Sequence, residues 1–285
     1  MAALVMAGAP CVEKLEQEQK ARVEALRQQG HTVCLAVVRV GDDPASIVYV
    51  RNKKKACERL GILSREVLLP GSITQADLEA ELDALAADDA VDGMLLQLPL
   101  PKGLDEKRAL SHIPYDKDAD GFRGENAGSL ITGTDGTLPC TPRGIMALLD
   151  FYGISLRGKS AVVVGRSAIV GKPVALMLLN ADATVTICHS KTENLSKWTR
   201  EADVIVAAVG KAGLITGDMI KPGAVLVDVG INRTEAGLKG DVDFDSVLEK
   251  ASAVTPVPGG VGKMTVCMLM ENVIELKERK VRALR

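Results

Sequence analysis

The sequence predicts an α/β protein of two domains, the second with a Rossmann-type parallel sheet. Three observations predict this class. Short apolar runs alternate with amphipathic segments along nearly the whole chain, which is the pattern of βαβ units. The length of 285 residues and the hydrophobic content of 47% allow two medium-sized cores. Between about 114 and 142 the pattern fades into a loop rich in Gly, Asp and Pro, which is expected to be functional or to connect domains.

The first predicted domain, residues 1–140, opens with a strand and a helix. The run TVCLAVVRVG is apolar and β-branched, as expected of a buried strand. The helix that follows has Asp43 as its N-cap, Pro44 at its first position and Gly61 at its end.

The same domain continues with a second strand, a helix and a third strand. SREVLLP is the second strand, and a capping-box-like pair of Thr74 and Asp77 begins a helix that runs to about Ala87. DGMLLQLPLP is a third strand that enters a proline loop.

The second predicted domain covers residues 141–263. Its first helix has Thr141 as cap and Pro142 in its first turn. Four apolar, β-branched strands follow, each ending in a turn or loop: SAVVVG, TVTIC, DVIVAAVG and AVLVDVG. The C-terminal helix, about residues 264–285, is expected to pack back on the first domain.

Composition argues against several classes of partner. The 35 Lys and Arg residues and 37 Asp and Glu residues leave a net charge of −2, so no nucleic-acid partner is expected. No charged leader precedes the short N-terminal apolar run, and no apolar stretch reaches about 18 residues, so no membrane partner is expected and the cytoplasm is the expected location. The six cysteines are scattered without CxxC spacing, which favours reduced, buried thiols over a disulfide frame or a metal site.

The segment VVVGRSAIVGKP follows a predicted strand and opens a predicted helix, where backbone N–H groups and the helix dipole favour a pyrophosphate. A GxGxxG fingerprint starting at Gly165 would require glycine at position 167, but Ser167 stands there and the next glycine is Gly171. Two interpretations stay open: a dinucleotide site, or a tight strand-to-helix turn.

The end of the next predicted strand reads CHSKT. An NAD site normally has an acid there that bonds the ribose 2′-hydroxyl, whereas this segment has His189, Ser190 and Lys191, and no carboxylate before Glu193. With Arg166 in the preceding turn, these groups suit a 2′-phosphate and favour NADP over NAD. The alternative is a solvated loop, in which His189 is a polar loop residue and not a base.

Helical phase separates one lysine of VYVRNKKKACERLG from its two neighbours. At about 100° per residue, Lys53 falls on one stripe with Tyr49, Ala56 and Leu60, while the next two lysines face solvent. A lysine on a buried stripe needs a partner, which makes Lys53 a candidate proton donor or acceptor. Tyr49, one turn earlier, is placed to pack on or hydrogen-bond a flat substrate. The alternative is a lysine that snorkels from the edge of the stripe.

Two further places carry candidate polar groups. Gln97 ends the apolar strand DGMLLQ, and open α/β sheets place ligands at strand C-termini, so its amide is a candidate partner of a lysine ammonium. An edge glutamine that faces water is the alternative. The loop segment DKDADG contains Asp116, Asp118 and Asp120, and the residues alone leave the choice among these aspartates open.

Eight segments occur together and in order: VGDDPASIVYVRNKKKAC, LLQLPLP, KDADGF, LPCTPRG, VVVGRSAIVGKP, CHSKT, VDVGIN and TPVPGGVGKMTV. Together they resemble the bifunctional methylenetetrahydrofolate dehydrogenase/cyclohydrolase enzymes, and the likeness spans about Gly8 to Glu275. The resemblance implies two domains around a cleft and NADP-dependent oxidation of 5,10-methylenetetrahydrofolate to the 5,10-methenyl form. It further implies hydrolysis to 10-formyltetrahydrofolate, a link to purine biosynthesis, and a homodimer formed through the cofactor domain.

The resemblance also implies roles for residues. Lys53 corresponds to the catalytic lysine of the family, Tyr49 to its tyrosine and Gln97 to the glutamine that partners the lysine. Asp120 corresponds to the aspartate that binds the pterin. The cofactor contacts fall on six positions: Gly165, Arg166, Ser167, Ser190, Ile231 and Thr265.

Pro258 and Gly259 are implied on the folate side of the cleft. Two departures concern local loop shape and cofactor affinity: Lys263 stands where many members have proline, and FRGEN follows the aspartate.

Two alternative functions are open to the sequence. A monofunctional dehydrogenase of the same fold is the nearest, and the complete set of Tyr49, Lys53 and Gln97 argues against it. A non-catalytic NADP-binding regulator would need the cofactor segments and not the lysine.

Overall fold

The computed structural model describes residues 2–235 and 237–283, and they form two units. The first unit consists of 14–138 and 266–283, and the second of 2–13 and 139–265 without the undescribed position 236. The predicted first domain included the first thirteen residues, but residues 2–13 belong to the second unit because β1 (Leu4–Val5) pairs with β11 (Ala253–Val254). No helix in the described parts of the chain is long and apolar enough to cross a membrane.

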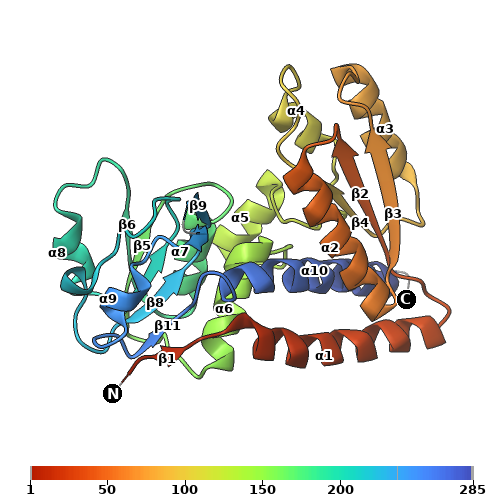
Figure 1. Cartoon of the computed structure of the whole chain (residues 1–285). Coiled ribbons are helices and arrows are strands. Elements are labelled where there is room, and N and C mark those ends of the chain that lie inside the picture. The colour runs from red at the N-terminus through yellow and green to blue at the C-terminus, as the bar shows by residue number, and fades with distance from the viewer. Residues whose placement is uncertain (1, 236, 284–285) are drawn as a thin grey trace. The chain divides into compact units, whose positions relative to one another are not determined.

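A parallel sheet of three strands forms the centre of the first unit, in the order β3-β2-β4 (Figure 1). The strands are β2 (Cys34–Val40), β3 (Leu63–Leu69) and β4 (Gly93–Leu96), which confirms the three predicted strands. A parallel bridge between Met94 and Asp118 extends the ladder beyond β4.

Six helices contribute to the first unit, of which α1 and α10 continue into the second: α1 (Gly8–Gln28), α2 (Pro44–Leu60), α3 (Gln75–Ala87), α4 (Glu106–Ser111), α5 (Gly124–Thr132) and α10 (Val261–Ala283). Within this unit α1 packs on α10, where Gln19 Nε2 donates to Glu271 Oε2 at 3.0 Å. The prediction of a loop from about 114 to 142 is wrong in part, because α5 lies within that range.

The predicted helix ends at α2 and α3 are confirmed. Asp43 accepts a hydrogen bond from the backbone N–H of Ser46 at 2.7 Å, and Gly61 ends α2 with a left-handed φ of 77°. Thr74 accepts from the backbone N–H of Asp77 at 3.1 Å at the start of α3. Because these bonds satisfy N–H groups that the helices themselves leave unpaired, short-range sequence signals were sufficient to locate both helices.

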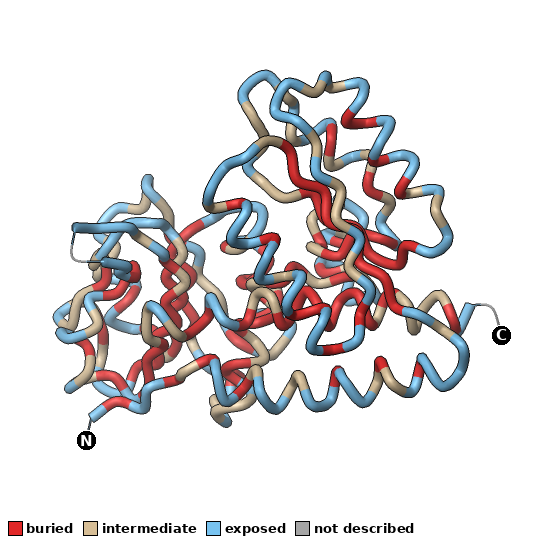
Figure 2. The backbone as a smooth tube through the Cα atoms, turned by 45° about the vertical axis from the view of Figure 1, so that its right-hand side comes forward, coloured by how far each residue is buried: buried red, intermediate tan, exposed pale blue. Residues whose placement is uncertain are grey.

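The core of the first unit follows the alternation of its strands. Alternate residues of β2 and β4 pack with one face of α3, in a cluster that contains Cys34, Ala36, Val38, Val40, Met94, Leu96, Leu78, Leu82 and Leu85. On the other side, Cys57 of α2 meets Met270 of α10, with their sulfur atoms 3.6 Å apart. Strands β2 and β4 are buried along their whole length, as Figure 2 shows in red.

A six-stranded sheet in the order β1-β11-β8-β7-β5-β6 forms the second unit, and every described pair in it is parallel. The four predicted strands are confirmed as β5 (Ser160–Val164), β6 (Thr184–Cys188), β7 (Val204–Ala207) and β8 (Val225–Asp228). Strands β1 and β11 were not predicted, since two residues each carry no readable periodicity.

The remaining elements of the second unit are α6 (Cys140–Phe151), α7 (Gly171–Asn180), α8 (Leu195–Thr199), the 3₁₀ helix η1 (Gly217–Met219), the hairpin β9 (Asn232–Thr234) and β10 (Gly237–Lys239), and α9 (Phe244–Val247). The prediction of Thr141 as a helix cap is wrong. Helix α6 begins at Cys140, two residues earlier than predicted, after Pro139 and without a side-chain cap. The Thr141 hydroxyl lies 3.0 Å from that of Thr265.

Candidate functional site

Lys53 and Gln97 are hydrogen-bonded to each other in the first unit, and we call this pair the lysine site. Lys53 Nζ donates to Gln97 Oε1 at 2.9 Å, and both side chains are half-buried. The other end of the amide is also engaged, because Gln97 Nε2 donates to the carbonyl of Leu98 at 2.7 Å. This second bond assigns the amide orientation, with its oxygen toward the ammonium.

The buried face of α2 explains why Lys53 reaches this position. Its buried residues are Ser46, Val50, Ala56, Cys57 and Leu60, and Lys53 lies on the same side. Tyr49 differs from the expectation of a stripe residue, since 48% of it is exposed and its ring is open to a ligand. Lys54 and Lys55 are exposed as predicted, and Lys54 Nζ pairs with Glu66 Oε1 at 2.6 Å.

Asp118 is buried and is occupied in holding its own loop. Its carboxylate accepts from the backbone N–H groups of Gly121 at 3.1 Å and Arg123 at 2.7 Å, and from Asn126 Nδ2 at 2.9 Å. Burial raises the pKa of Asp118, against the lowering effect of these three donors. Asp118 is therefore a structural group that fixes the residues around Asp120.

Asp120 stands at the same edge of the sheet as Gln97. Asp118 bridges to β4 in parallel register, so the chain two residues later is level with the carboxyl end of that strand. Asn272, which is fully buried, donates from Nδ2 to the carbonyl of Ala119 at 2.8 Å and so holds the residue before Asp120. Asp120 itself is half-buried, and it follows the strand-like segment in the way that ligand-binding residues of open α/β sheets do.

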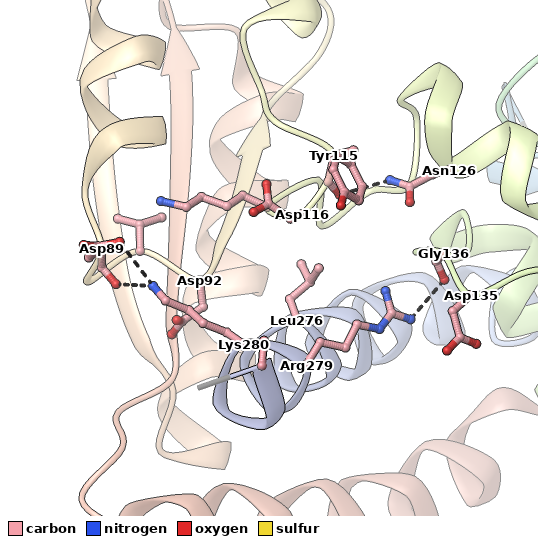
Figure 3. Close-up of a pocket in the computed structure, with 13 residues that line it drawn as sticks. Asp89, Asp92, Tyr115, Asp116, Asn126, Asp135, Gly136, Leu276, Arg279 and Lys280 are labelled. Carbon is pink, nitrogen blue, oxygen red and sulfur yellow. Dashed lines mark hydrogen bonds and ion pairs between the residues drawn. The ribbon is translucent and has the colours of Figure 1, made fainter. Parts of the chain in front are cut away.

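A separate cavity of about 510 Å³ lies at the opposite, amino-terminal edge of this sheet. Its walls include Val91 and Asp92, which precede β4, and Asp116, which precedes the bridge residue (Figure 3). Lys280 Nζ donates to the carbonyl of Asp89 at 2.6 Å across one side of it. Asp116 therefore belongs to this cavity and is not at the edge that carries the lysine site.

The glycine loop of the second unit follows β5. A Cβ atom on Gly165, whose φ is 129°, would lie 2.3 Å from the carbonyl oxygen of Ala208, and one on Gly171 would lie 2.4 Å from that of Gly165. Both positions thus require glycine. Ser167 Oγ accepts from the backbone N–H groups of Val170 and Gly171, at 3.2 Å each. The backbone of this loop therefore makes the close contacts that are typical of a dinucleotide-binding turn, although its sequence departs from GxGxxG.

This loop lies at the switch point of the sheet. The chain passes from β5 through α7 to β6 on one side, and then returns to β7 on the other side of β5. In open parallel sheets, ligands bind outside the carboxyl ends of the strands at this point. The residues present fit a dinucleotide there, because glycine at 165 and 171 lets the backbone after β5 lie close to the loop after β7 and to the start of α7.

Arg166 and Ser190 follow neighbouring strands at equivalent positions. The last residues of β5 and β6 are paired, so the second residue beyond each strand lies at the same edge, and both side chains are exposed. His189 Nδ1 faces the backbone N–H of Lys191 at 3.1 Å, which agrees with a loop-forming role for that histidine. A hydroxyl and a guanidinium are therefore available at one edge.

The other predicted residues of the second unit lie after β8 and before or within α10. Ile231 is 54% exposed, and Pro258 and Gly259 form the turn that precedes α10. Thr265 lies within α10, where its hydroxyl meets that of Thr141. Lys263 is exposed in the first turn of α10, and its backbone N–H donates to the carbonyl of Gly260 at 3.1 Å, a bond that a proline here would lose.

The comparisons with known proteins agree along the chain. A family model described as "Tetrahydrofolate dehydrogenase/cyclohydrolase, catalytic domain" matches residues 6–120, and one described as "Tetrahydrofolate dehydrogenase/cyclohydrolase, NAD(P)-binding domain" matches 139–281. The chain is similar to "Bifunctional protein FolD" of Burkholderia cenocepacia, with 52% identity over 284 residues, 99% of this chain and 99% of that protein.

Solved structures show the same likeness. The bifunctional FolD methylenetetrahydrofolate dehydrogenase/cyclohydrolase from Campylobacter jejuni is 48% identical with a TM-score of 0.96, covering 98% of this chain and 100% of that one. The Trypanosoma brucei methylenetetrahydrofolate dehydrogenase-cyclohydrolase, in complex with NADP and an inhibitor, is 38% identical with a TM-score of 0.92, covering 99% of each chain.

Proposed function

The chain belongs to the tetrahydrofolate dehydrogenase/cyclohydrolase family, and we propose how its residues carry out the dehydrogenase and cyclohydrolase reactions. Membership of this family makes it a bifunctional enzyme of folate one-carbon metabolism. It oxidises 5,10-methylenetetrahydrofolate to 5,10-methenyltetrahydrofolate with NADP and then hydrolyses the product to 10-formyltetrahydrofolate. The observation that carries the assignment is the bond of 2.9 Å between Lys53 and Gln97, at the same sheet edge as Asp120.

Lys53 manages the protons of the hydrolysis. Water adds to the one-carbon centre and loses a proton, which leaves a hydroxyl group on that carbon. The bond from the carbon to N5 then breaks, N5 takes up a proton, and the hydroxyl loses its proton to become the formyl carbonyl, so one proton is released in total. A half-buried ammonium in a fixed position is suited to deliver and accept these protons. Gln97 holds the lysine by its amide oxygen, and the bond to the Leu98 carbonyl keeps that oxygen from turning away.

Asp120 and Tyr49 bind and orient the folate. The Asp120 carboxylate accepts paired N–H bonds from the amino-pyrimidine edge of the pterin, and the exposed ring of Tyr49 packs on the flat substrate. Pro258 and Gly259 line the folate side. The buried bonds to Asp118 and Ala119 support this role, because they hold the chain on either side of Asp120.

The second unit holds the cofactor. Gly165, Ser167 and the N-terminus of α7 receive the pyrophosphate, and Arg166 and Ser190 bind the 2′-phosphate. NADP, when bound, supplies the hydride acceptor. Two further residues complete the set, Ile231 beside the nicotinamide and Thr265. What the chain supplies to this step is chiefly alignment.

We also propose that the enzyme is a cytoplasmic homodimer formed through the second unit and that its product serves purine biosynthesis. The support for the dimer is the resemblance to this family, which implies contact through the cofactor domain. Sedimentation of the purified protein tests the dimer, and a monomer at all concentrations rejects it.

A spectroscopic assay of methylenetetrahydrofolate oxidation, with NADP and NAD side by side, tests the dehydrogenase. Conversion of methenyltetrahydrofolate without nucleotide tests the cyclohydrolase. Turnover above the buffer rate is expected in both. If only the first is seen, the enzyme is a monofunctional dehydrogenase, and if neither is seen while NADP binds, it is a regulator.

A further inference from the structure

The second unit contains two buried carboxylates to which the proposed mechanism gives no role. Asp228, the last residue of β8, is 3% exposed, and Asp241 is fully buried. Burying a carboxylate is costly unless hydrogen bonds compensate for the lost water. The donors around these two groups therefore indicate what they hold in place.

Asp241 collects four N–H groups from two separate loops. Three come from consecutive backbone positions after β7, namely Val209 at 2.6 Å, Gly210 at 2.9 Å and Lys211 at 2.7 Å. The fourth is Asn232 Nδ2 at 2.9 Å. One side chain thus ties the loop after β7 to the loop after β8.

Asp228 fastens the segment that carries Asp241. Its Oδ1 accepts from the backbone N–H of Gly230 at 3.0 Å and that of Asp241 at 2.8 Å, and its Oδ2 accepts from Val242 at 2.9 Å. Asp228 at the end of β8 therefore holds the segment that carries Asp241, and Asp241 in turn holds the loop after β7.

Both carboxylates sit in spaces that only glycine permits. A Cβ on Gly230 would lie 2.1 Å from Asp241 Oδ1, and one on Gly240 would lie 1.8 Å from Asp228 Oδ2. The arrangement leaves little room for adjustment.

The tied loops are those that border the cofactor residues. The loop after β7 begins at Ala208, whose carbonyl oxygen occupies the space where a side chain on Gly165 would lie. At the other end of the tie, Asn232 is the neighbour of Ile231 along the chain.

We propose that Asp241 is a positioning residue for the dehydrogenase: its carboxylate fixes the loop after β7 against the Ile231–Asn232 segment, in the arrangement that NADP requires. The inference rests on the proposed function and assigns that site a supporting residue. The lysine site is in the other unit, so Asp241 has no part in the hydrolysis.

The variant Asp241→Asn tests this assignment. An amide presents one oxygen and an NH₂ group to four donors, so at least one loop loses its bond. We expect the KM for NADP in the dehydrogenase assay to rise at least about tenfold, equivalent to about 1.4 kcal/mol. Cyclohydrolase turnover without nucleotide should stay within about twofold of the wild type, whereas general unfolding would lower both activities.

Asp203→Asn is the matched control. Asp203 also accepts a backbone N–H, from Ser160 at 2.8 Å, and pairs with Lys221 at 2.7 Å, but it lies at the amino-terminal ends of β5 and β7. Its loss should lower the melting temperature and leave the KM for NADP unchanged. The inference is overturned if Asp241→Asn leaves this KM unchanged, or if it lowers both activities alike, as general unfolding would.

If Asp241→Asn does not fold, Asn232→Ala decides the question, because it removes one of the four donors and leaves the backbone bonds. A rise of about threefold or more in the KM for NADP supports the inference, and an unchanged KM overturns it. A wild-type protein without NADP-dependent turnover would instead reject the proposed function.

Discussion

Replacing Lys53 by Met removes the ammonium of the lysine site and keeps an unbranched stem of similar length. Proton transfer by a positioned side chain contributes about 10²- to 10⁴-fold, which is about 3 to 5 kcal/mol of the barrier. We therefore expect cyclohydrolase turnover to fall by at least about a hundredfold. Of the bonds described above, the fold loses the one to Gln97, between two half-buried groups, which costs about 1 kcal/mol.

Lys54→Met is the control, since it removes an equal charge from the next residue of the same helix. Lys54 pairs with Glu66 on the surface, and such pairs contribute about 0 to 1 kcal/mol to stability. Its turnover should match that of the wild type.

The assay follows the loss of methenyltetrahydrofolate without nucleotide, with circular dichroism to verify folding. Turnover of a folded Lys53→Met protein within about threefold of the wild type would refute the role of Lys53 in proton transfer.

Three other predictions concern binding and pH. Asp120→Ala should raise the KM for methylenetetrahydrofolate about tenfold or more, because bonds to a charged group contribute about 1.5 to 3 kcal/mol; an unchanged KM argues against pterin binding by Asp120. Arg166→Ala should reduce the ratio of kcat/KM with NADP to that with NAD about tenfold or more, and an unchanged ratio rejects its contact with the 2′-phosphate. Burial raises the pKa of Asp228 from 3.8 to about 6, so its protonated form stabilises the fold at low pH and this contribution is lost as pH rises through about 6. A shift of one pKa unit corresponds to about 1.4 kcal/mol, so the free energy of unfolding of the wild type, relative to that of Asp228→Asn, should fall by up to about 3 kcal/mol between pH 4 and 7. Urea titrations of both proteins measure this difference, and a difference that does not change with pH contradicts the prediction.

Helix α2 and the longer strands could be predicted from the sequence because their signals are local. The cap at Asp43 and the left-handed turn at Gly61 each involve residues within one turn of the helix end. Lys53 was singled out in the same way, by its phase on that helix. Its bond to Gln97 could only be suggested, since the two are 44 positions apart.

The features that were missed depend on distant contacts. Helix α5 contains two glycines and lies in a Gly-rich stretch, and its Asn126 is fixed by a bond to Asp118. Strand β1 pairs with residues near 253, so no local pattern marks it. The tie from Asp241 was invisible because its donors follow two different strands. Tyr49 shows that helical phase alone does not predict burial, since Tyr49 is exposed although it lies on nearly the same side of α2 as the buried Leu60.

Neither unit is a single stretch of chain, and this determines the order in which they can be completed during synthesis. Buried groups of the first unit take their partners from the far end of the chain: Asn272 holds Ala119, and Lys277 pairs with Asp92 at 3.1 Å. A ribosome releases the N-terminal part first, so residues 14–138 must wait, partly unsatisfied, until the whole second unit has been made. A stop codon directly after Thr265 would therefore spare the cofactor loops and remove the support of Asp120.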